Sequence, residues 1–112
     1  MENKQMEYSF GMDEEITPKE FALLTSQVQS ALSQILNFGV NNLPVKGRIK
    51  EEMESVFDQL EELHEKWRDC SLYKPRSPFN NWLIVNYMKN IVKLGDIHNG
   101  LLTQFMVEKR KN

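Results

Sequence analysis

Residues 49–70, IKEEMESVFDQLEELHEKWRDC, decide the fold of this chain. Their apolar residues recur at alternating spacings of four and three, the repeat that forms a single stripe along an α-helix. Acidic residues cover most of the remaining helix surface. The stripe consists of Ile49, Met53, Val56, Leu60, Leu63, Trp67 and Cys70. A helix of 22 residues is about 33 Å long, so the sequence predicts that other long helices cover this stripe.

An earlier helix begins at the sequence Thr17-Pro18-Lys19-Glu20. Thr17 is suited to cap the first free amides, Pro18 suits the first helical position, and Glu20 completes a capping box. The apolar residues that follow recur every three or four positions as far as residue 38. The pattern predicts a helix over 17–38, which Gly39 ends in a left-handed conformation.

The pair Ser77-Pro78 repeats the signal of a cap followed by proline, so we expect the last helix to begin there. Gly95 and Gly100 each disfavour the helix interior by about 1 kcal/mol. The apolar repeat nevertheless keeps one phase through both glycines. We therefore predict one long helix over 78–109, bent near Gly95; a break at Gly95 would instead give a four-helix bundle.

The predicted fold is all-α, an antiparallel three-helix bundle with helices over 17–38, 48–71 and 78–109. A chain of 112 residues with 40% hydrophobic residues fits a single bundle domain, here 17–112. Residues 1–16 are predicted to form an extended N-terminal arm, because apolar and polar residues alternate in it. The apolar residues of the arm are Met6, Tyr8, Phe10 and Met12.

Cysteine usage and hydropathy indicate the compartment. Cys70 is the single cysteine, which fits a reducing environment. The N-terminus lacks the apolar core of a signal peptide, and no apolar run is long enough to span a membrane. We expect a soluble cytoplasmic protein that does not bind a membrane.

Catalytic and metal-binding patterns are weak. His64 and Cys70 stand six positions apart on one predicted helix, so with Asp69 they form no catalytic triad. Glu61 and His64 have the spacing of a helical metal-ligand pair, but a second pair and further acidic ligands are missing from the predicted helices. We therefore predict a protein that is not an enzyme and has no metal or cofactor.

The favoured function is that of a non-enzymatic helical protein–protein interaction module, such as a small regulator, an inhibitor or a complex subunit. Aromatic residues and arginine dominate the energy of many interfaces. The candidate partner-binding residues are Tyr8, Phe10, Tyr73, Arg76 and Trp82. The last helix carries more apolar residues than one core requires, so we also expect a homodimer. The candidate self-association residues are Leu101, Leu102, Phe105 and Met106.

Nucleic-acid binding is the alternative, because basic residues gather in the second half of the chain. Residues 1–65 carry a net charge of −8 and residues 66–112 a net charge of +6. The candidate nucleic-acid-binding residues are Lys89, Lys93, Lys109, Arg110 and Lys111. The overall net charge of −2 argues against this function, since dedicated nucleic-acid binders carry a strongly basic domain. The asymmetry is explained more simply by an acidic middle helix lying beside a basic last helix.

Overall fold

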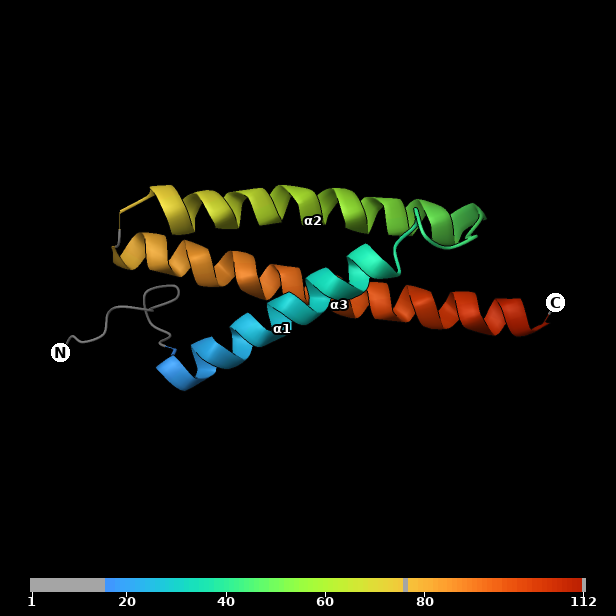
Figure 1. Ribbon diagram of the computed structural model, residues 1–112, viewed down its shortest axis with the longest axis horizontal. Helices are drawn as coiled ribbons and strands as arrows, with labels where there is room; N and C mark the ends of the chain where they lie inside the picture. The colour runs from blue at the N-terminus through green and yellow to red at the C-terminus, as the bar shows by residue number, and fades with distance from the viewer. Residues whose placement is uncertain (1–15, 76, 112) are drawn as a thin grey trace.

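The computed structural model describes residues 16–75 and 77–111 of the chain. It contains three α-helices: α1 (Pro18–Asn37), α2 (Gly47–Tyr73) and α3 (Pro78–Lys111). Successive helices run in opposite directions (Figure 1). The predicted all-α, antiparallel three-helix fold is therefore confirmed. The predicted arm lies almost wholly in residues 1–15, outside the described residues.

The predicted helix starts are confirmed at α1 and α3. Thr17 and Glu20 form a full capping box, in which the backbone N–H of Glu20 donates to Thr17 Oγ1 and the backbone N–H of Thr17 donates to Glu20 Oε1. At α3 the Ser77 hydroxyl accepts from the backbone N–H of Asn80 at 3.1 Å. Caps of this kind satisfy amides that have no partner within the helix.

The prediction that Gly39 ends the first helix in a left-handed conformation is wrong. α1 ends at Asn37, and among the described glycines only Gly47, the first residue of α2, has a positive φ, of 65°. Gly39 is buried, and a Cβ there would collide with the backbone carbonyl oxygen of Ile35. This glycine provides room for a close approach and not for a left-handed turn. The last carbonyls of α1 are instead bound by the side-chain amide of Asn42, which donates to Leu36 at 2.8 Å.

The last helix is continuous through both Gly95 and Gly100. A helix of 34 residues is about 51 Å long, and it forms the centre of the molecule, which measures 60 × 23 × 19 Å. α2 runs alongside α3, whereas α1 crosses α3 obliquely and ends near its middle (Figure 1). α1 packs on α3 and makes few contacts with α2.

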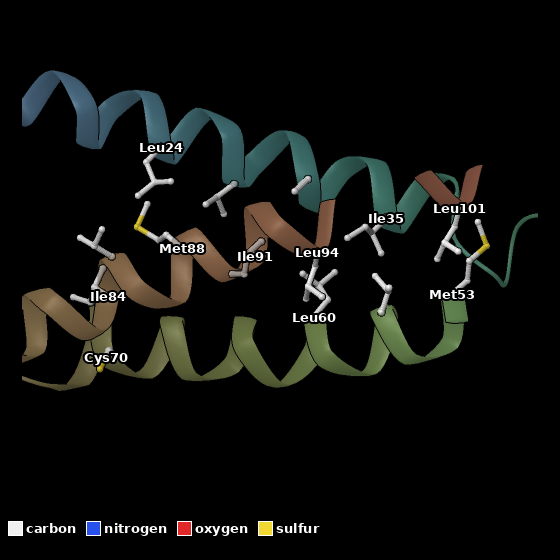
Figure 2. Packing of buried hydrophobic residues seen from close by; sticks show 14 of the residues in the cluster. Leu24, Ile35, Met53, Leu60, Cys70, Ile84, Met88, Ile91, Leu94 and Leu101 are labelled. Carbon is white, nitrogen blue, oxygen red and sulfur yellow. The ribbon is translucent and has the colours of Figure 1, made fainter. Parts of the chain in front are cut away.

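Side chains from all three helices form one core (Figure 2). Leu24 of α1, Leu60 of α2 and Ile91 of α3 all belong to this core, so the apolar stripe of each helix faces it. The stripe of residues 49–70 is buried except at Leu63 and Trp67, which are half-buried. At the end of α1 the apolar pattern predicted too wide a buried surface, because Leu36 and the C-cap residue Phe38 are exposed although the neighbouring Ile35 is buried.

Candidate interaction surfaces

The turn between α2 and α3 is short and held by hydrogen bonds. The chain leaves α2 at Lys74 in extended conformation, and Ser77 caps the start of α3. The side-chain amide of Asn80 donates to the carbonyl oxygen of Pro75 at 2.7 Å. The backbone N–H of Asn81 donates to the carbonyl oxygen of Ser77 at 2.8 Å. These bonds fix the residues on both sides of the turn.

Large apolar side chains are exposed on both sides of this turn. Leu72 and Tyr73 belong to the last turn of α2, and Tyr73 is 74% exposed. Phe79 belongs to the first turn of α3, is 55% exposed, and stacks on Trp82 with ring centroids 5.9 Å apart. Trp82 is half-buried and packs against the core. We call Leu72, Tyr73, Phe79 and Trp82 the tip cluster.

The tip cluster contains two of the predicted partner-binding residues, Tyr73 and Trp82. Phe79 and Leu72 were missed by the sequence analysis, because in the sequence they resemble ordinary core residues. The signal that identifies Phe79 is its position directly after the capping pair Ser77-Pro78, where a helix has just begun. The other predicted residues of this group, Tyr8, Phe10 and Arg76, lie outside the described residues.

The predicted self-association residues have unequal exposure. Leu101 is only 4% exposed and belongs to the same buried cluster as Met53 and Ile35. Leu102 and Phe105 are half-buried against that core, and Met106 is 52% exposed. The chain from residue 38 to 46 continues beyond the end of α1 and contributes the buried Val45 to the core. Leu101 is therefore used inside this chain and does not offer a surface.

A polar contact lies in the core where α1 crosses α3. His98 is fully buried, and its Nδ1 is 3.1 Å from Nε2 of Gln34. The same Gln34 nitrogen donates to the carbonyl oxygen of Gly95 at 3.4 Å. Burial lowers the pKa of His98 from its ordinary value of 6.5, and an interaction with the Phe38 backbone opposes part of this shift. The sequence placed His98 in the apolar phase of the last helix but did not indicate its partner.

The basic residues do not form one surface. Lys89 and Lys93 are exposed one turn apart, and Lys109 lies over the ring of Phe105 at 5.9 Å. At about 100° per residue, Lys93 and Lys109 point about 160° apart around α3. Arg110 is exposed beyond them, and Lys111 ends the helix. Lys93 and Lys109 therefore lie on different faces of α3.

The histidine and cysteine that were considered for catalysis or metal binding, His64 and Cys70, lie on α2 among many acidic side chains. His64 is exposed, and its ring lies against that of Trp67 with centroids 5.9 Å apart. Among the described residues no group of three or more His, Cys, Asp or Glu side chains is placed to hold a metal ion. Cys70 is buried as the stripe predicted. The exposed pairs Arg48–Glu52 and Lys66–Glu62 follow the helical i, i+4 spacing.

Two further observations concern membrane-spanning helices and similarity to known proteins. No helix in the described part of the chain is long and apolar enough to cross a membrane. In the comparisons with known proteins, no protein-family model, no curated protein and no solved structure matches this chain.

Proposed function

We propose that this chain is a non-enzymatic protein–protein interaction module that associates with itself through the tip cluster. The observation that carries the proposal is the exposure of Leu72, Tyr73 and Phe79 together at one end of the bundle. Clustered apolar residues on a surface are typical of interaction sites, and aromatic residues are enriched in the centre of interfaces.

The geometry favours an end-to-end contact between two copies. Such a contact repeats the same patch on both partners, which is the usual arrangement of a symmetric dimer. The molecule is 23 × 19 Å across its two shorter directions, so an end-on contact buries well below the ~800 Å² per partner of a standard interface. We therefore expect weak self-association that depends on protein concentration.

Light scattering after size exclusion tests this proposal across a wide concentration range. The expected mass rises from the 13.2 kDa of one chain toward twice that value. Replacing both Tyr73→Ser and Phe79→Ser should leave a single chain at every concentration. Leu23→Gln is the matched control, because Leu23 is also highly exposed but lies on α1. A mass that stays at one chain throughout, or a dimer that the double substitution leaves intact, would overturn the proposal.

Small-angle scattering of the associated form tests the end-to-end arrangement separately. Two copies joined at the tip should have a maximum dimension close to twice the 60 Å length of the molecule. A dimer with a maximum dimension close to that of one copy would place the contact along the sides of the helices. In that case the exposed residues of α3 near Met106 become the expected contact.

A further inference from the structure

The attachment of α1 depends on one contact surface. α1 packs on α3 through Leu24, Val28, Ala31 and Ile35, and it makes few contacts with α2. α2 and α3, in contrast, pack along most of their length (Figure 1). If one helix of the bundle separates from the other two, it is therefore α1. The free energy of docking α1 therefore depends on its contact surface with α3, which contains Gln34 and His98.

Hydrogen bonding identifies the protonation state of His98 that fits this surface. Because Gln34 Nε2 also faces the carbonyl oxygen of Gly95, the amide nitrogen and not the amide oxygen points to the imidazole. A nitrogen that donates to Nδ1 requires Nδ1 to be unprotonated, so the fitting ring is neutral with its proton on Nε2. A second proton on Nδ1 would set two donors against each other at 3.1 Å.

The surroundings offer little to compensate a charge on this ring. His98 Nε2 is buried with no hydrogen bond of good geometry to the described residues, and only the Phe38 backbone interacts with the ring as an acceptor. The covering segment, residues 21–45, contains no charged or titratable side chain. On α3 the flanking Lys93 and Asp96 are exposed, and on α2 the acidic Glu52 is half-buried and paired with Arg48. No Asp or Glu among the described residues is buried.

We propose that His98 is an acid-sensitive switch that keeps α1 docked on α3 while the ring is neutral and releases α1 when the ring gains a proton. Release turns the ring out to water, where both N–H groups find partners. It also exposes the apolar residues of α1 and the surface of α3 beneath them. The chain would then present in acid an apolar surface that it buries at neutral pH, whichever partner the tip cluster binds.

The direction of the pH dependence follows from linkage. Burial holds the pKa of His98 below 6.5 in the docked form, so the released form binds more protons at mildly acidic pH. Docking is fully stabilised above about pH 6.5, the ordinary pKa, and loses stability as the pH falls below that value. One proton per molecule limits the loss to about tenfold in the docking equilibrium per pH unit.

Amide hydrogen exchange followed by NMR tests the switch on the full chain between about pH 7.5 and 5.5. After correction for intrinsic exchange, amides in the middle of α1, such as Val28, should be less protected at every pH than those of Leu60 in α2 and Ile91 in α3. Their protection should stay constant above about pH 6.5 and fall by up to about tenfold per pH unit below it. NMR titration of the ring should show that His98 of the docked protein gains its proton only below pH 6.5, the ordinary pKa.

Two variants assign the effect to this ring. His98→Asn keeps an oxygen near the position of Nδ1 to accept from Gln34 and cannot titrate, so α1 protection should become independent of pH in this interval. His64→Gln removes the other histidine of the chain, which is exposed, and should behave as the unaltered protein.

Three outcomes would overturn the switch. The protection of α1 amides in the unaltered protein could be independent of pH. It could also equal the protection of amides in α2 and α3, which would mean that α1 never opens alone. The dependence could also persist in His98→Asn. If that variant does not fold, the exchange pattern and ring titration of the unaltered protein decide alone. α1 protection that does not fall below about pH 6.5, or a His98 ring that titrates at or above that pH, then refutes the proposal.

Discussion

A Cβ atom placed on Gly95 would lie 2.7 Å from the Cβ of Ala31, closer than two such atoms approach in folded proteins. The buried backbone of α3 at Gly95 and the small side chain of Ala31 on α1 therefore fix how closely the two helices cross. The neighbouring Gln34 can reach the carbonyl oxygen of Gly95 and the ring of His98 because of this closeness. Gly95 is a packing position and not a break in the helix.

Gly95→Ala should destabilise the protein even though alanine is the better helix former. The added methyl group must push α1 away from α3, and overpacking of this kind costs about 1–3 kcal/mol. That cost exceeds the gain of about 1 kcal/mol in helix propensity. Urea unfolding followed by circular dichroism measures the change.

Gly100→Ala is the matched control for that substitution. A Cβ at Gly100 meets nothing within 4 Å, and the position is exposed. We expect this variant to be more stable than the unaltered protein by up to about 1 kcal/mol. Equal effects of the two substitutions would show that the crossing is looser than described.

Gln34→Ala should destabilise the bundle at neutral pH by about 1–3 kcal/mol, because it leaves Nδ1 of the buried His98 without its donor. Urea midpoints at about pH 7.5 measure this loss. Gln29→Ala, an exposed position on the same helix, should change the stability little. If both variants unfold at the same midpoint, the contact between Gln34 and His98 contributes nothing to stability.

Truncation should destabilise the protein far more at Leu101 than at Met106. Leu101→Ala creates a cavity in the core and should cost about 2–5 kcal/mol in the free energy of unfolding. Met106→Ala removes a side chain that is about half exposed and should cost much less. Denaturant unfolding of both variants is the measurement, and a tolerated Leu101→Ala would mean that this end of α3 is not part of the core.

The capping box at the start of α1 should weaken in strong acid. Hydrogen bonds from the backbone N–H of Thr17 and from its side chain lower the pKa of Glu20 below 4.5. The stabilisation that the charged carboxylate gives is present above about pH 4.5 and is lost as the pH falls through the lowered value. NMR titration of the Glu20 carboxyl carbon measures this pKa directly.

Thr17→Ala tests the cause of that shift. The variant keeps the backbone N–H and loses the hydroxyl, so the pKa of Glu20 should return part of the way toward 4.5. The shift should remain in the same direction, because the backbone hydrogen bond is the larger cause. A pKa of Glu20 that is unchanged by Thr17→Ala would show that the hydroxyl has no part in the shift.

The sequence by itself determined the helices, because the signals that start a helix and select its buried face are local. Thr17 and Ser77 cap amides within their own first turns, and the stripe from Ile49 to Cys70 follows from helical periodicity alone. The candidate surface was only partly predictable. Tyr73 and Trp82 were identified by residue type, but their grouping with Phe79 depends on two helix ends meeting at a turn.

Only the tertiary structure decided how α1 meets α3. The oblique crossing places Gly95 against Ala31 and brings Gln34 to His98, residues separated by more than sixty positions in the chain. It also decided that Leu101 is buried, because the core continues past the end of α1 and includes Val45 of the following segment. Helical periodicity shows which face of a helix is buried but not the neighbour that buries it, since crossing angle and distance are set by the side chains of both helices.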